Sequence, residues 1–177
     1  TCFTDWYKDA EFLIKKLTTG KQILIGSSMG GWVMLMLCKL LPQRVSAMIG
    51  LAPAPDFPKN LIWENMSSLQ RRQLILSKNI PITDQNKSNQ FFSYKLIKDS
   101  FNNLTLTEDI CFNGPVNIYH GIKDQDVPYK LSMEILNKIK CSQNVSLLLD
   151  KEAGHRLSEP NQLNRIIDIL KRTLKDI

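Results

Sequence analysis

Apolar residues follow two different spacings along the chain. Where they recur at every third or fourth position, the pattern predicts an amphipathic helix. Where several run together between turn residues, it predicts a strand buried on both faces. Helices are therefore expected at residues 4–17, 28–40, 129–139 and 162–177, and strands at 21–26, 45–51, 115–119 and 145–149. Helices and strands alternate, which predicts an α/β fold with a mostly parallel sheet and flanking helices.

The alternation breaks in the middle of the chain. This segment opens with Pro53, Pro55 and Pro58, and its amphipathic pieces at 61–66, 69–76 and 92–104 suggest helices. The polar stretch Thr83–Gln90 separates these pieces. We expect a helical cap or lid at 53–110, inserted into a core made of 1–52 and 111–177.

The sequence G-S-S-M-G at 26–30 stands between a predicted strand and a predicted helix. A sharp strand-to-helix turn strains its corner residue and exposes the Ser28 hydroxyl above the sheet. Small residues two positions to either side, Gly26 and Gly30, are expected to avoid collisions there. The Met29 N–H would stabilise an oxyanion. The alternative is a serine that merely caps the helix, and Ser27, which lacks the glycine spacing, is a weaker nucleophile candidate.

A serine nucleophile needs a base, and the chain has two histidines. His120 ends a predicted strand and is expected to bond locally. His155 follows the last strand on a loop, so we expect it to be the base, although an exposed bystander is the alternative. The acid is expected between Ser28 and His155 in chain order. Asp124 and Asp126 both qualify by spacing, with the other one capping the loop.

Three motifs, G-S-S-M-G-G-W, H-G-x-K-D-x-D-V-P and G-H, resemble the α/β-hydrolase superfamily across essentially the whole chain. Residues 2–37 and 120–128 are similar to its abhydrolase-domain thioesterases and acyl-glucuronide esterases. The resemblance implies hydrolysis of carboxylic esters or thioesters through an acyl-enzyme, with Asp124 as the acid and Asp126 in reserve. We expect no cofactor, and no metal, since the chain has two histidines and neither lies near a cysteine pair. The resemblance also implies an acyl pocket under the cap, for which the candidate lining residues are Phe57, Leu61, Trp63, Phe91 and Phe92.

The family has further strands before this segment, and a loop among them supplies a second oxyanion donor. Nothing before Gly26 resembles that loop, so we expect a fragment or processed product of a longer protein. Loss of one oxyanion donor typically lowers the rate by roughly 10²–10³. The competing hypothesis is therefore an impaired or non-catalytic fragment that acts as a binding or degenerate protein. Another enzyme class on the same fold, such as an acyltransferase or peptidase, is a third reading.

Composition narrows the choice of partners. The net charge of +6 comes from scattered lysines, with Lys15-Lys16 and Lys171-Arg172 as small clusters, which disfavours nucleic-acid binding. No apolar run reaches the roughly 18 residues of a membrane span. The cysteines, Cys2, Cys38, Cys111 and Cys141, form no C-x-x-C pair, so we expect reduced thiols in a cytoplasmic protein. The expected partners are a small-molecule or acyl-protein substrate and a missing N-terminal segment of the same protein.

Overall fold

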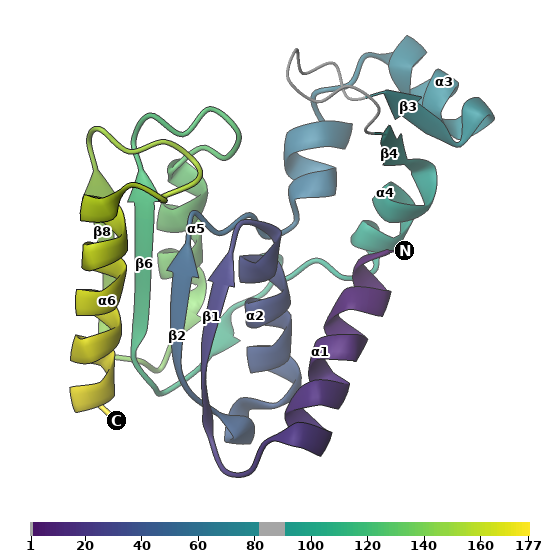
Figure 1. Cartoon of the computed structure of the whole chain (residues 1–177). Coiled ribbons are helices and arrows are strands. Elements are labelled where there is room, and N and C mark those ends of the chain that lie inside the picture. The colour runs from purple at the N-terminus through teal and green to yellow at the C-terminus, as the bar shows by residue number, and fades with distance from the viewer. Residues whose placement is uncertain (1, 82–90) are drawn as a thin grey trace.

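The computed structural model describes residues 2–81 and 91–177, and its centre is a parallel sheet (Figure 1). The sheet has four strands in the order β1-β2-β6-β8. These strands are β1 (Gln22–Ser27), β2 (Val45–Leu51), β6 (Val116–Gly121) and β8 (Val145–Asp150). Every neighbouring pair is parallel. The predicted α/β fold is confirmed, and each of the predicted strands lies within two residues of its expected bounds.

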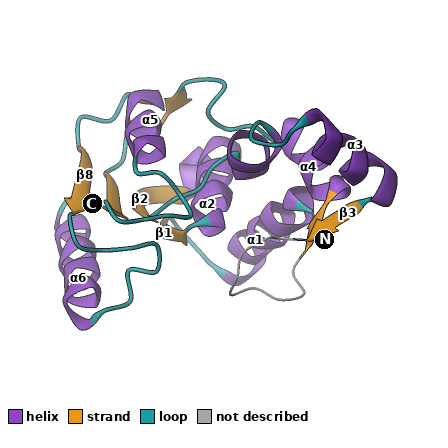
Figure 2. Cartoon of the chain, turned by 90° about the horizontal axis from the view of Figure 1, so that it is seen from above, coloured by secondary structure: helices purple, strands orange, loops and turns teal. Residues whose placement is uncertain are grey.

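Helices cover both faces of this sheet. The helices α2 (Met29–Leu40) and α5 (Lys130–Lys138) pack on one face, and α6 (Pro160–Lys175) packs on the other (Figures 1 and 2). Because β2 and β6 lie in the middle of the sheet, their side chains are buried almost continuously. This explains why both strands are mostly apolar in sequence, although β6 also buries the polar side chains of Asn117 and His120.

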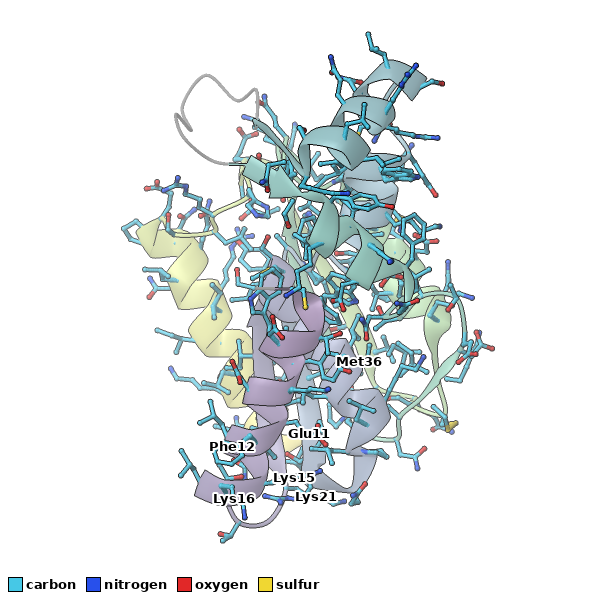
Figure 3. The ribbon with its side chains drawn as sticks, turned by 90° about the vertical axis from the view of Figure 1, so that its right-hand side faces the viewer. Glu11, Phe12, Lys15, Lys16, Lys21 and Met36 are labelled. Atoms are coloured by element: carbon cyan, nitrogen blue, oxygen red, sulfur yellow. A yellow bond between two sulfur atoms is a disulfide. The ribbon has the colours of Figure 1, made fainter. Side chains whose placement is uncertain are left out.

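The first helix, α1 (Phe3–Leu17), packs on the outer side of α2. The Phe3 ring stacks on Trp32 with 3.5 Å between ring centroids. The opposite face of α1 meets solvent, where Lys15 pairs with Glu11 at 2.6 Å and Phe12 is 58% exposed (Figure 3). The Lys15-Lys16 cluster is thus at the solvated end of a helix, as expected for surface lysines.

Among its described residues, the segment between β2 and β6 contains three helices and a short strand pair. The helices are the π-helical η2 (Pro58–Trp63), α3 (Ser68–Ser77) and α4 (Tyr94–Phe101). The expected helical pieces are therefore observed, although α4 begins later than predicted because β4 (Phe91–Ser93) pairs with β3 (Asn79–Pro81) instead. The stretch Thr83–Gln90 lies outside the described residues. The division into a core and a cap at 53–110 stays a prediction.

A buried carboxylate ties the two ends of this segment together. Asp56, 2% exposed, accepts hydrogen bonds from the Thr105 N–H at 2.8 Å, the Thr105 hydroxyl at 3.0 Å and the Leu106 N–H at 2.9 Å. Asp56 also has a left-handed backbone, with φ of 56°. This contact, together with the packing of Phe57 on Trp32, holds the helical segment on the core.

The cysteines differ from the expectation of four reduced thiols. Two-residue strands β5 (Ile110–Cys111) and β7 (Ile139–Lys140) pair in parallel and bring Cys111 beside Cys141, with 5.5 Å between their Cα atoms, in a disulfide. The prediction is wrong for this pair because the contact is tertiary and spans 30 residues of sequence. Cys2 and Cys38 are free and buried. Burial raises the pKa of Cys38 to about 12.

None of the helices within residues 2–81 and 91–177 has the length and apolar character needed to cross a membrane.

Candidate active site

Ser28 stands at the corner between β1 and α2. Its backbone has φ of 50° and ψ of −120°, a strained conformation for a residue with a Cβ. The Ser28 N–H donates to the Leu51 carbonyl, and the Ser28 carbonyl accepts from the N–H groups of Gly31 and Ala54, each at 2.9 Å. Ser28 precedes the helix, yet its hydroxyl makes no capping bond. The strained corner is thus observed, and the simple helix-cap reading does not describe this side chain.

Glycines next to the corner allow the chain to approach itself closely. A Cβ on Gly26 would lie 2.7 Å from the Gly30 carbonyl carbon, and a Cβ on Gly31 would lie 2.8 Å from Pro53 Cα. A Cβ on Gly30 would meet nothing within 4 Å. The prediction that Gly30 must be small is therefore wrong. The close contact falls one residue later, where α2 crosses the chain that leaves β2.

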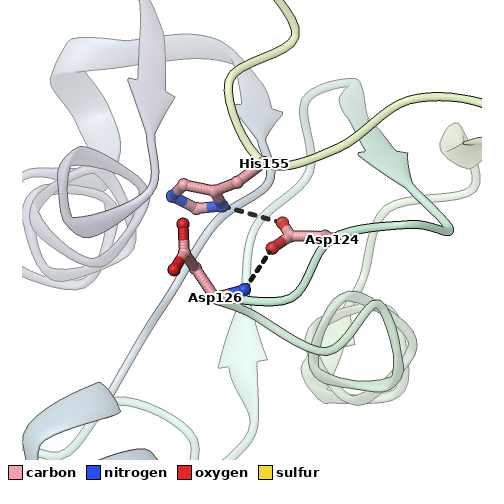
Figure 4. Close-up of side chains that lie close together, drawn as sticks. All are labelled: Asp124, Asp126 and His155. Atoms are coloured by element: carbon pink, nitrogen blue, oxygen red, sulfur yellow. Dashed lines mark hydrogen bonds and ion pairs between the residues drawn. The ribbon is translucent and has the colours of Figure 1, made fainter. Parts of the chain in front are cut away.

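His155 bridges Ser28 and Asp124. Its Nε2 lies 3.0 Å from Ser28 Oγ, and its Nδ1 lies 2.7 Å from Asp124 Oδ2. Figure 4 shows the imidazole turned toward the Asp124 carboxylate. A carboxylate can only accept, so Nδ1 carries the proton and Nε2 is left to accept from the Ser28 hydroxyl. The structure therefore brings together the three side chains that the sequence singled out.

Both oxygens of the Asp124 carboxylate accept hydrogen bonds. Oδ1 accepts the backbone N–H groups of Asp126 at 2.9 Å and Val127 at 2.8 Å, while Oδ2 faces His155 (Figure 4). The Asp124 side chain is fully buried. Asp126 is exposed, and its carboxylate lies beside the imidazole (Figure 4). Of the two candidate aspartates, Asp124 both caps the loop and faces His155.

The loops that carry Asp124 and His155 lie against each other. The Lys123 N–H donates to the Ala153 carbonyl at 3.0 Å, and the Ile122 N–H donates to the Asp150 carbonyl at 2.8 Å. A Cβ on Gly121 would lie 2.7 Å from the Gly154 carbonyl oxygen, so only glycine allows this approach. The H-G pair of the motif thus has a local reason for its glycine.

A polar cluster supports the base of the His155 loop. The buried Tyr119 hydroxyl donates to Asp150 Oδ2 at 2.7 Å, and Arg165 pairs with the same oxygen at 3.2 Å. The Glu152 N–H donates to Asp150 Oδ1 at 3.1 Å. Burial, followed by the bond to Asp150, raises the pKa of Tyr119 to about 12, and the Tyr119 hydroxyl lowers the pKa of Asp150. Nothing in the motifs pointed to this cluster.

His120 makes a contact that sequence reasoning missed. It was expected to bond locally, and it does so through Ser132 and Val127. Its Nε2 also lies 3.1 Å from Asp124 Oδ2, the oxygen that faces His155. Burial lowers the pKa of His120 below its ordinary value of 6.5, so the ring is neutral at pH 7. No linear pattern in the sequence signals this contact, because it depends on the direction of the His120 side chain within β6.

Asp124, Asp126 and His155 offer atoms within 4.8 Å of one another, a spacing that a metal ion could bridge. However, both His155 nitrogens are already engaged, by Asp124 and by Ser28. A metal here would have to displace the hydrogen bonds that join these three side chains. The group therefore does not favour a metal centre.

The apolar residues proposed for an acyl pocket have other partners. Phe57 packs edge-on against Trp32 at 5.9 Å, and Trp63 packs edge-on against Phe101 at 6.1 Å, measured between ring centroids. Leu61 packs against the main core. Phe57 and Leu61 thus pack the helical segment on the core, and Trp63 packs within the segment. The side chain of Phe91 lies outside the described residues, and the lining of an acyl pocket stays a prediction.

Comparisons with known proteins extend over the whole chain. Residues 1–175 match the prolyl oligopeptidase family. The human palmitoyl-protein thioesterase ABHD10, mitochondrial, is 31% identical over 166 residues, which cover 92% of this chain and 53% of the relative. The bovine protein of the same name is 30% identical over 166 residues. The chain thus spans about half the length of the curated relatives it matches. Their names place those proteins in mitochondria, so the expected cytoplasmic location stays a prediction.

Solved structures agree with this assignment. Mouse alpha/beta hydrolase domain-containing protein 10 superimposes with a TM-score of 0.91 at 27% identity, covering 99% of this chain and 70% of that chain. A hydrolase from Agrobacterium vitis S4 superimposes with a TM-score of 0.92 at 29% identity, covering 98% of this chain and 69% of that chain. The resemblance read from the three motifs is thereby confirmed. The chain belongs to the prolyl oligopeptidase family, within the α/β-hydrolase superfamily.

Proposed function

We propose that Ser28, His155 and Asp124 form the catalytic triad of a hydrolase that cleaves ester or thioester bonds. The observation that carries this proposal is the continuous hydrogen-bond path from Ser28 Oγ through His155 to Asp124, with distances of 3.0 and 2.7 Å. Ser28 lies at a strained backbone corner, and its hydroxyl makes no hydrogen bond that caps α2. Nucleophile, base and orienting acid in this geometry are the parts that acyl transfer requires.

In the proposed reaction Ser28 Oγ attacks the carbonyl carbon of the substrate while His155 Nε2 takes the hydroxyl proton. The resulting imidazolium is stabilised by Asp124, and His155 then returns the proton to the leaving alcohol or thiol. This releases the leaving group and leaves an acyl ester on Ser28. A water molecule, deprotonated by His155, then attacks the acyl carbon. The bond to Ser28 Oγ breaks, His155 returns the proton to Oγ, and the carboxylic acid leaves.

The negative oxygen of the tetrahedral intermediate needs hydrogen-bond donors. The Met29 N–H lies in the first turn of α2, where a helix N–H has no partner within the helix. The positive end of the helix dipole adds to its effect. We therefore assign Met29 as an oxyanion donor in this site.

The substrate class follows from relatives rather than from the pocket. The curated relatives are named palmitoyl-protein thioesterases, which supports a thioester with a long acyl chain. Because the match covers 53% of the human relative, the activity of these relatives is proposed for this chain. A panel of acyl thioesters and p-nitrophenyl esters of increasing chain length tests it, since a long-chain thioesterase should turn over long thioesters fastest.

The triad is tested with a fluorophosphonate probe, which labels activated serines. We expect an adduct on Ser28 that the Ser28→Ala variant abolishes. Ser27→Ala is the matched control, because Ser27 is an exposed neighbour with the same side chain. It should retain labelling. An adduct that persists in Ser28→Ala would contradict the proposal. If neither this chain nor any longer protein containing it reacts, the non-catalytic reading holds instead.

A further inference from the structure

His120 is a fully buried histidine with every polar atom of its ring occupied. Nδ1 lies 2.6 Å from the Ser132 hydroxyl, and Nε2 lies 3.0 Å from the Val127 carbonyl and 3.1 Å from Asp124 Oδ2. These contacts join β6, which carries His120, to α5, which carries Ser132. The Asp124 loop lies between these two elements. The histidine is thus built into the frame of the acid loop.

The partners fix the proton positions on this ring. A carbonyl and a carboxylate only accept, so His120 Nε2 must carry a proton that it shares between Val127 and Asp124. On a neutral ring, Nδ1 then has no proton and accepts from the Ser132 hydroxyl. Val127 and Asp124 therefore select the tautomer that points an N–H at Asp124, and the Ser132 hydroxyl satisfies the unprotonated Nδ1.

Asp124 consequently has two imidazole donors on one oxygen. Oδ1 is held by two backbone N–H groups, and Oδ2 receives His155 Nδ1–H at 2.7 Å and His120 Nε2–H at 3.1 Å. Without His120, only His155 would contact Oδ2, and the carboxylate could rotate about its hydrogen bonds at Oδ1. A shift of about 1 Å in catalytic geometry can lower a rate on the order of 10²-fold.

We propose that His120 is a positioning residue, which, oriented by Ser132, holds Asp124 Oδ2 at the distance that His155 requires. This inference rests on the proposed triad. It assigns a role to a buried histidine that the reaction itself does not use. His120 adds a donor without adding a charge, so it fixes the carboxylate and leaves His155 as the one imidazole that becomes positive.

Two amide substitutions separate positioning from simple packing. The Gln side chain places its amide near the position of imidazole Nε2, whereas the shorter Asn side chain reaches only the position of Nδ1. His120→Gln can therefore keep the bond to Asp124, and His120→Asn can keep only the bond to Ser132. Both variants replace the ring by the same chemical group, so they form a matched pair.

The main readout is the NMR signal of the His155 Nδ1 proton in its bond to Asp124, which does not require turnover. We expect His120→Asn to shift or broaden this far-downfield resonance and His120→Gln to preserve it. Fluorophosphonate labelling of Ser28 should fall roughly 10- to 100-fold in His120→Asn, with partial rescue in His120→Gln. In substrate assays the loss should appear in kcat, with KM nearly unchanged, because His120 does not touch the substrate site.

Ser132→Ala is a second variant for the case in which His120→Asn does not fold, because it removes only one hydroxyl. It should lower labelling in the same direction as His120→Asn, by a smaller factor, with native circular dichroism. An unchanged Nδ1 resonance and unchanged labelling in both His120→Asn and Ser132→Ala would overturn the inference. Failure of the triad itself is a different result, namely a wild-type protein whose Ser28 does not react while the Nδ1 resonance still responds to His120.

Discussion

The contact between Asp56 and residues 105–106 allows a sharp prediction about stability. The substitution is Asp56→Asn, which keeps the shape of the side chain and tolerates the observed φ of 56°, since asparagine adopts left-handed backbone readily. An amide has one oxygen where the carboxylate has two. Whichever way it turns, its NH₂ group faces either the Thr105 N–H or the Leu106 N–H, and one of these buried donors is left without an acceptor.

The magnitude follows from the cost of that unpaired group. Leaving one buried donor unsatisfied costs about 1–3 kcal/mol. With an m-value of about 2 kcal/mol/M in urea, the unfolding midpoint should fall by roughly 0.5–1.5 M. Asp9→Asn is the matched control, because Asp9 is exposed on α1 and surface substitutions usually change stability by less than about 0.5 kcal/mol.

Urea unfolding followed by circular dichroism measures the shift, and hydrogen exchange locates it. The amide protons of Thr105 and Leu106 should exchange faster in Asp56→Asn, while those of β6 change less. A midpoint shift no larger than that of Asp9→Asn, with unchanged exchange at both amides, would refute the reasoning that this carboxylate fastens the helical segment to the core.

Three further predictions follow from other contacts. Gly31→Ala should lower both the stability of the protein and the labelling of Ser28, because the added Cβ would lie 2.8 Å from Pro53 Cα. Gly30→Ala should be tolerated, because its Cβ would meet nothing within 4 Å. Equal effects of the two substitutions in thermal melting and probe labelling would contradict this packing. Thiol titration of the denatured, unreduced protein should find only Cys2 and Cys38, and four reactive thiols would rule the disulfide out. Cys111→Ser should lower the free energy of unfolding by about 3.5 kcal/mol if closure of the loop between Cys111 and Cys141 dominates. Because burial depresses the pKa of His120 below 6.5, the unfolded chain binds this proton first as pH falls, so the free energy of unfolding should decrease below about pH 6.5. His120→Gln should flatten that decrease in urea titrations, and an equal slope would show that other groups cause it.

The sheet could be predicted from sequence because its central strands are buried on both faces. β2 and β6 are mostly apolar in sequence, and the amphipathic helices α1, α5 and α6 carry apolar residues at every third or fourth position. The pairs β3–β4 and β5–β7 could not be predicted in the same way. Strands of two or three residues carry no periodicity, and their pairing depends on tertiary contacts.

The candidate site was likewise predictable only in part. Ser28 and His155 were identified because each follows a predictable strand, and strand ends meet at one edge of a parallel sheet. Asp124 and Asp126 are equivalent by spacing, and only the folded loop directs the Asp124 carboxylate toward His155. The contact from His120 to Asp124 depends on the direction of a side chain within β6, and the contact at Gly31 depends on how the chain beyond β2 crosses α2. Neither is visible in a linear pattern.

The central claim is that Asp124 and His155 activate Ser28. The most direct measurement is the rate at which a fluorophosphonate modifies Ser28 in Asp124→Asn and Asp126→Asn, two isosteric changes two positions apart. Loss of the acid disturbs the histidine tautomer and typically lowers such rates by about 10⁴. We predict a loss of that order in Asp124→Asn and a nearly unchanged rate in Asp126→Asn. Equal rates in the two variants, or a larger loss in Asp126→Asn, would contradict the account.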